Sequence, residues 1–287
     1  MSHVRPQLFD GAAHALAKAR ARRIAGERFL DSVAAEGLAD RLAPVTRRFA
    51  RGLFIGEAVP AAIAPYAEQW TLGSLDADER LAVEGRFDLA VSLFSLQAVN
   101  DLPGALAQIH AHLNPDGLFL AALLGGATLR ELRESFAAAE IATRGGVSPR
   151  ISPFADVRDA GALLQRAGFA LPVADVERLT VRYGDFFGLV RDLRAHGLTN
   201  VMAERSRAFL RRDTLAALIA HYTAHHADAD GKLRAQFETI YLTGWAPHES
   251  QQKPLAPGSA KTRLAEALGV AEHSAGESPI SGSSRHS

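Results

Sequence analysis

The sequence predicts an α/β fold in which helices cover a sheet of mainly parallel strands. Two apolar runs, "FDLAVSLFSL" at 87–96 and "LFLAALL" at 118–124, have the length and composition of strands buried on both faces. Between them, "LPGALAQIHAHL" is typical of a helix and "NPDG" of a turn. An earlier strand at "GLFIG" opens a strand, turn and helix unit. This alternation predicts right-handed crossovers and a doubly wound sheet.

The N-terminal part, residues 1–45, predicts a helical extension. Residues 8–43 are rich in helix formers and space their apolar side chains three and four apart. We expect two helices that join near Phe29 to Asp31. After the strand at "GLFIG", the segment "PAAIAPYAEQW" predicts a helix that Pro60 opens, because proline suits the first helical position. Residues 71–85 then predict one or two short strands.

The later chain predicts a main domain over 46–250 that carries a helical insertion. Helices are expected at 127–143 and 156–169, a strand at 176–183, a helical insertion at about 186–227 and a last strand at 237–247. Residues 251–287 are dominated by Ser, Gly, Pro and Gln, which predicts a mostly disordered tail.

Composition excludes several functions. The chain has 32 basic and 32 acidic residues, so net charge gives no argument for binding nucleic acid. The chain contains no cysteine, which excludes disulfides, thiolate metal sites and cysteine nucleophiles. No apolar run approaches the roughly 20 residues of a membrane span, and we expect a cytoplasmic protein. There is also no GxSxG elbow and no Walker loop.

A histidine cluster near residue 225 has spacing that a metal could use. His221 and His225 stand four residues apart on an expected helix, with His226 beside them. A polar helix end is commonly rich in such residues. The following "HADADG" fails as a calcium loop, because Phe237 stands where the bidentate Glu is needed. We therefore expect no metal.

Several irregular motifs in order resemble a known family. The segments "FDLAVSLFSLQAVNDLPGALAQIHAHLNPDGLFLAALLGG" and "GGVSPRISPFADVRDAGALLQRAGF" resemble class I S-adenosylmethionine-dependent methyltransferases. Together with "VRYGDFFGLVRDLRAHGLTN" and "YLTGWAPHESQQKP", they look like the methyltransferase-like assembly factors of respiratory complex I and their bacterial relatives. The resemblance spans about residues 8–260. It implies a Rossmann-like class I methyltransferase sandwich with S-adenosylmethionine as cofactor.

The resemblance also indicates where the cofactor site departs from the family. The family's glycine-rich turn is "LFIGEAVP" here, which keeps Gly56 but places Glu57, Val59 and Pro60 at the permissive positions. Asp76 or Asp78 could supply the carboxylate that binds ribose, or could lie in an exposed turn. The resemblance places two more cofactor contacts after the next strand, Ser92 and Phe94. The family's aromatic and histidine there are replaced by Gln97 and Ala98.

Polar family motifs suggest a substrate or partner surface. The loop "RGGVSPRISPF" provides Arg144, Ser148 and Arg150, and loops on a scaffold often carry binding groups. An ordered connection pinned by prolines is an equal alternative. We expect "RDLRAHG" and "GWAPHES" to form the opposite wall. Their candidate contacts, with one from the preceding strand, are Tyr183, Asp192, Arg194 and His248.

Two functions follow from this pattern. The first is a methyltransferase-family protein that uses S-adenosylmethionine on a protein or carrier-bound substrate, with a complex I subunit or a carrier protein as partner. The second is a cofactor-free assembly or binding factor that keeps the partner surface. The degraded turn at Gly56 predicts that S-adenosylmethionine binds weakly or not at all.

Overall fold

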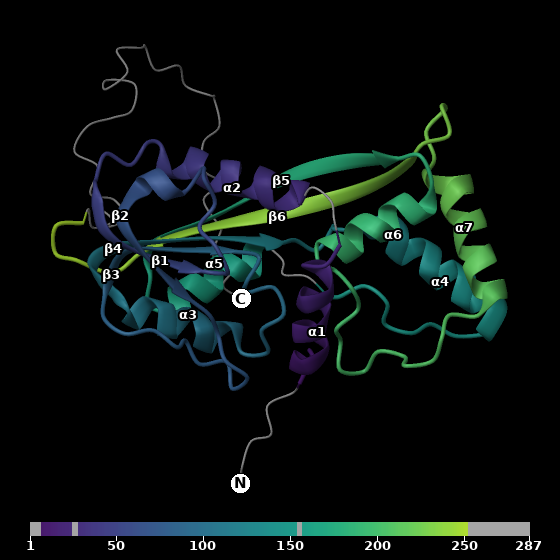
Figure 1. Cartoon of the computed structure of the whole chain (residues 1–287), viewed down its shortest axis with the longest axis horizontal. Coiled ribbons are helices and arrows are strands. Elements are labelled where there is room, and N and C mark those ends of the chain that lie inside the picture. Colours follow the sequence, from purple (N-terminus) through teal and green to yellow (C-terminus); the bar gives the residue numbers. More distant parts are fainter. Residues whose placement is uncertain (1–6, 25–27, 154–156, 252–287) are drawn as a thin grey trace, which may run out of the picture. The chain divides into compact units, whose positions relative to one another are not determined.

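The computed structural model describes residues 7–24, 28–153 and 157–251. Its larger compact unit, Met1–His248, contains a six-stranded sheet in the order β2-β1-β3-β4-β6-β5 (Figure 1). The strands are β1 Phe49–Ile55, β2 Ala67–Gly73, β3 Phe87–Leu93, β4 Leu113–Leu124, β5 Ala170–Tyr183 and β6 Leu233–Trp245. The first four are parallel, whereas β6 is antiparallel to both β4 and β5.

Helices cover both faces of the sheet. They are α1 Gly11–Ala21, α2 Phe29–Leu42, α3 Leu102–Ala111, α4 Arg130–Arg144, α5 Val157–Arg166, α6 Phe186–Ala195 and α7 Arg212–His226. Along β4, Phe119 and Ala121 pack in the core with α3 and α5, whereas Leu118 and Leu120 pack in the core with α2. Burial on both faces explains why this strand is continuously apolar.

A further core forms where β5 and β6 extend beyond the parallel strands. Leu132 of α4, Leu189 of α6 and Leu218 of α7 are buried there against Phe237 of β6. These helices gather at the right of Figure 1, away from β1, β2 and β3. The antiparallel pair is therefore the support on which α4, α6 and α7 pack.

The doubly wound α/β class is confirmed, but the prediction of a helix at 60–70 is wrong. A 3₁₀ turn, Ala64–Tyr66, leads into β2 instead. Pro65 is the second residue of that turn, and Ala67 is already extended. Trp70 lies over Gly52 of β1, where a Cβ would approach the indole to 2.6 Å. Pairing with β1 thus overrides the helix propensity of this alanine-rich segment.

Three boundaries also differ from prediction. The first two helices do not join at 29–31, because α2 begins at Phe29. The "NPDG" segment interrupts the β3–β4 register and lies inside β4. The helical insertion is split, since residues 196–211 between α6 and α7 are not helical. The expected tail at 252–287 lies outside the described residues. In the described part of the chain, no helix is long and apolar enough to cross a membrane.

Close packing of α2 on β6 gives a stability prediction. A Cβ at Gly37 would collide with the hydroxyl of the buried Tyr241, whose ring Arg41 also covers at 3.5 Å. We expect Gly37→Ala to lower the free energy of unfolding by about 1–3 kcal/mol through overpacking. Gly11→Ala, which meets nothing within 4 Å, is the matched control and should change it by less than about 0.5 kcal/mol. Urea denaturation of both variants measures this, and equal effects would contradict it.

Candidate functional site

The sheet order reverses between β1 and β3, and this switch point is where open α/β sheets usually bind ligands. From β1 the chain crosses to β2 on one side, and from β3 it crosses to β4 on the other. The carboxyl ends of β1 and β3 bring Gly56, Ser92 and Phe94 to this edge. Three of the sequence-predicted cofactor residues are therefore brought to one edge of the sheet.

The turn after β1 lacks the geometry of a cofactor cradle. The Gly56 amide donates to the Gly73 carbonyl at 3.0 Å, and a Cβ at Gly56 would lie 2.5 Å from the Phe54 ring. Gly56 follows the last residue of β1 and leaves room for the Phe54 ring of that strand. Glu57 is exposed and accepts a hydrogen bond from Arg22 Nε at 3.0 Å. Between β1 and β2 the described chain forms no α-helix, so no helix N-terminus faces the turn.

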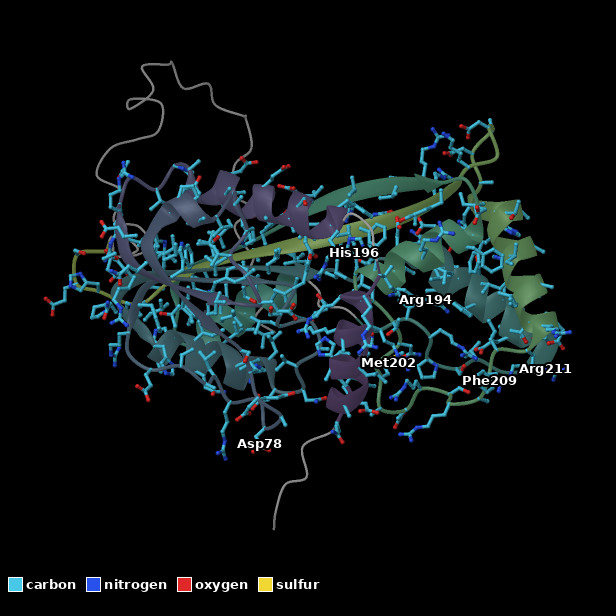
Figure 2. All side chains as sticks on the ribbon, viewed as in Figure 1. Asp78, Arg194, His196, Met202, Phe209 and Arg211 are labelled. Carbon is cyan, nitrogen blue, oxygen red and sulfur yellow. The ribbon has the colours of Figure 1, made fainter. Side chains whose placement is uncertain are left out.

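The two candidate ribose carboxylates lie in an exposed turn. Asp76 Oδ1 accepts the backbone amides of Asp78 at 2.9 Å and Arg80 at 2.8 Å. Asp78 is exposed, and Figure 2 shows it far from the labelled His196. The sequence left two interpretations of these carboxylates open, a ribose contact and an exposed turn, and the contacts favour the exposed turn. Both carboxylates follow the carboxyl end of β2, the strand end that pairs with Ile55 and Gly56, and there Asp76 is occupied by local backbone bonds.

Sequence analysis missed the acidic residue that does reach the loop after β3. Glu79 accepts the amides of Asn100 at 2.6 Å and Asp101 at 2.7 Å. Its backbone has a positive φ of 60°, which a non-glycine residue adopts rarely. Asn100 in turn donates to the Phe9 carbonyl at 3.2 Å. The signal in the sequence, an acidic residue before a strand, was too general to single out Glu79.

The N-terminal helix α1 packs over this same edge. Ala17 of α1 and the preceding Phe9 are buried with Val201, and Ala98 packs against them. Burial, with a smaller effect of nearby Lys18, lowers the pKa of His14 to about 4. The small cavity beside His14 measures about 50 Å³, whereas cofactor-sized ligands need about 300–1,000 Å³. The residues that line this cavity do not include Gly56, Ser92 or Phe94, so its volume does not measure the space at the ends of β1 and β3.

Ser92 and Phe94 have unusual local environments. The Ser92 hydroxyl is buried and has no hydrogen-bond partner among the described residues. Phe94 has a φ of 51°, and its amide donates to the Ala122 carbonyl at 3.0 Å. Ser92 and Phe94 lie at the carboxyl end of β3, and none of the contacts described for them defines a cofactor role.

A larger cavity of about 620 Å³ opens beside the start of α4. Its described lining residues are Gln7, Leu8, Gly126, Arg133, Pro149, Ile151, Pro153, Met202 and Glu204. Arg133 donates to the carbonyls of Gly126 at 3.2 Å and Thr128 at 3.4 Å, which fixes its guanidinium at the wall. The cavity is therefore mostly apolar with a few charged groups, which is the usual composition of a ligand site. Sequence analysis did not predict Arg133.

The loop that lines this cavity is held by a buried carboxylate. Glu140 is 1% exposed and accepts the Ser148 amide at 2.7 Å and Arg150 Nε at 2.8 Å, and Arg144 lies 3.4 Å away. Burial alone would raise the pKa of Glu140. The bonds from Ser148 and Arg150 outweigh burial and lower that pKa below its usual value. Three of the predicted substrate residues thus surround one carboxylate.

Arg150 is not a freely exposed loop arginine. Its side chain is 14% exposed and ion-paired with Glu140, because the loop folds back onto α4. Arg194 is exposed on α6, and Figure 2 labels its position. Mutation of Arg150 therefore tests the ion pair that holds the loop, whereas mutation of Arg194 tests an exposed side chain.

The remaining predicted residues lie in two places. Tyr183 is buried at the end of β5, where burial and, secondarily, Asp192 raise its pKa. His248 is exposed beyond β6, whose last residue, Trp245, pairs with Leu118 at the start of the parallel part of β4. That is the opposite edge of the sheet from Gly56. The "GWAPHES" segment therefore does not form the opposite wall of the site.

The histidine cluster on α7 has structural contacts. His221 stacks on His225 with ring centroids 4.0 Å apart, and its Nδ1 lies 3.1 Å from Ser135 Oγ. Across the residues that the structure describes, no group of three His, Asp or Glu is placed to hold a metal.

The Glu140 network gives a second stability prediction. Arg150→Ala should lower the free energy of unfolding by about 3 kcal/mol, because it leaves a buried carboxylate short of a partner. Arg194→Ala is the exposed control and should change the free energy of unfolding by less than about 0.5 kcal/mol. Because the folded pKa of Glu140 is lowered, its contribution is present above the unfolded pKa and is lost as pH falls through the folded value. Denaturation at neutral and acidic pH measures both effects, and equal stabilities of the two variants would refute the assignment.

Comparison with known proteins places this chain in a family. A model described as "Methyltransferase domain" matches residues 4–172. The human "Arginine-hydroxylase NDUFAF5, mitochondrial" is 46% identical over 183 residues, which cover 64% of this chain and 53% of the relative. The zebrafish (Danio rerio) protein of that name is 43% identical over 183 residues, or 64% of this chain and 57% of the relative. The chain thus spans about half the length of these curated relatives.

A second group of relatives carries a different name. The "Malonyl-[acyl-carrier protein] O-methyltransferase" of Laribacter hongkongensis is 35% identical over 193 residues, which cover 67% of this chain and 62% of the relative. Among solved structures, the YcgJ protein of Bacillus subtilis has a TM-score of 0.49 at 14% identity, covering 75% of this chain and 98% of that one. The resemblance to the complex I assembly factors is confirmed by sequence identity. Since the family model matches more than half of its residues, the chain belongs to the methyltransferase-domain family.

Proposed function

We propose that this member of the methyltransferase family binds a chemical group carried by a protein or a carrier protein, in the cavity that Arg133 lines. One set of relatives is named for arginine and the other for a malonyl group on acyl-carrier protein. The observation that carries the proposal is the apolar cavity of about 620 Å³. A complex I subunit is the other partner that the resemblance implies, and a cytoplasmic location stays a prediction.

The charged residues of the cavity favour an anionic group. Arg133 is half-buried and held by two backbone carbonyls, so its position is fixed before a ligand arrives. Glu204 also lines the cavity but is exposed. A guanidinium pairs well with a carboxylate, and a fixed donor loses less side-chain entropy on binding. We therefore favour a carrier-bound acyl chain that ends in a carboxylate over an arginine side chain.

Methyl transfer from S-adenosylmethionine is the second candidate function. The family match over residues 4–172 favours it. The turn at Gly56, the packing of α1 over the switch point and the exposed position of Asp76 argue against a family-type cofactor site. We accordingly favour a binding or assembly role in which the cofactor is held weakly or not at all.

Cofactor binding separates the two functions. We expect isothermal titration with S-adenosylmethionine to give a dissociation constant weaker than about 100 μM, because no cradle faces the switch point. A constant of about 1 μM or tighter would instead establish the transferase. In that case Asp76→Asn and Asp78→Asn, made together, would test the ribose contact, and unchanged affinity would remove that assignment.

The role of Arg133 can be tested separately. Arg133→Ala should weaken binding of a malonyl-loaded acyl-carrier protein by about tenfold, or about 1.4 kcal/mol, since it removes the anion partner. Arg130→Ala is a matched control one turn earlier on α4, because Arg130 is exposed and pairs with Glu134 at 2.7 Å. Titration with the loaded carrier measures both variants. Equal affinities would rule out this role for Arg133.

A further inference from the structure

Three large apolar side chains are exposed around the C-terminal end of α4 and the approach to α7. Ile141 is 60% exposed, Val147 is 62% exposed and Phe209 is 99% exposed. A phenylalanine with almost all of its surface in water has no stabilising role in the folded chain. Clustered exposed apolar side chains with a polar rim mark interaction sites.

Two contacts, one between α4 and α7 and one between the loops that follow α4 and α6, connect the segments that carry these side chains. Thr143 near the end of α4 lies 2.8 Å, hydroxyl to hydroxyl, from Thr214 in the first turn of α7. Asn200 Nδ2 donates to the Pro149 carbonyl at 2.8 Å and so joins loop 145–153 to loop 196–211. Figure 2 shows Phe209 and Arg211 near each other at this end of the helical cluster. We call this region the tip surface, made of Ile141, Arg144, Val147, Arg207, Phe209, Arg211 and Arg212.

The tip surface is positively charged. Arg211 pairs with Asp213 at 2.6 Å, and Arg144 lies 3.4 Å from Glu140. Arg207 and Arg212 are exposed, and among the described residues neither forms an ion pair within 4.0 Å, but Arg207 lies near enough to Asp10 to help lower the pKa of that carboxyl. Asp10, which pairs with Arg205 at 2.9 Å, is a third carboxylate near these arginines. The four arginines of the tip surface still outnumber the neighbouring carboxylates Glu140, Asp213 and Asp10.

The same two loops form the wall of the larger cavity. Loop 145–153 contributes Ile151 to the lining, and loop 196–211 contributes Met202. A partner seated on the tip surface would therefore contact segments that continue into the cavity. A flat lipid surface could meet the same charges and Phe209, but it would have no use for the adjoining cavity.

We propose that the tip surface docks an acidic protein, the carrier whose acyl group enters the cavity. This inference rests on the proposed function and adds the docking site and the charge of the partner. Phe209 supplies the apolar anchor, and Arg207 and Arg212 supply charge complementarity, which steers association and favours one orientation. Aromatic and arginine side chains are the residues most enriched at such contacts.

The experiment measures binding of malonyl-loaded acyl-carrier protein to the full chain at low and high ionic strength. Phe209→Ser and the double variant Arg207→Glu/Arg212→Glu should each weaken binding by about tenfold. The double variant should also lose or reverse the salt dependence, because Glu replaces attraction to an acidic partner with repulsion that salt screens. Phe187→Ser and Arg191→Glu, both exposed on α6, are the matched controls and should bind like wild type. Thermal melting checks that every variant folds.

Each result bears on the proposal. Unchanged binding by folded tip variants overturns it, and if Arg133→Ala still weakens binding the proposed function survives. A wild-type chain that fails to bind the carrier overturns both. If the wild type binds phosphatidylglycerol vesicles in place of the carrier, and the tip variants lose that binding, the tip surface is a lipid contact and the protein-docking proposal is wrong.

Discussion

The connection from β1 to β2, residues 56–66, is the constraint on which the arrangement of the switch-point edge depends. It ends in a 3₁₀ turn and contains no α-helix, so no helix N-terminus faces the edge. The edge is covered instead by α1, which pairs Arg22 with Glu57 and packs near Ala98. Because the interior of a protein is close-packed, the position of α1 determines how much of this edge is open to a ligand.

A second interaction organises the other half of the molecule. Glu140 collects hydrogen bonds from Ser148 and Arg150 and so fixes the loop that follows α4. Such a carboxylate is costly to bury unless every oxygen is satisfied, which makes the loop conformation well defined. One side of the loop lines the cavity through Ile151, and the other presents Val147 to solvent. Binding chemistry and exposed surface therefore have a common support.

The fold was predictable from sequence where the local residue pattern favours the same secondary structure as the tertiary packing. The runs that became β3, β4 and β6 are apolar because both faces of each strand are buried. Prediction failed at 60–70, where an alanine-rich segment pairs with β1 as a strand. The pairing of Arg150 with Glu140 was not predictable, since nothing in the sequence indicates that Glu140, ten residues earlier on a polar helix, is buried. The segment "GWAPHES" was misplaced because strand direction depends on a partner far along the chain.

By itself, the sequence determined the α/β class, the family and the loss of the glycine-rich turn, because strand periodicity and turn glycines are encoded within a few neighbouring residues. Tertiary structure alone decided which groups meet. It turned Asp76 into a local turn acceptor, brought Arg133 to the wall of a cavity and left Phe209 in water. These outcomes depend on contacts between segments far apart in the chain, which no local pattern specifies.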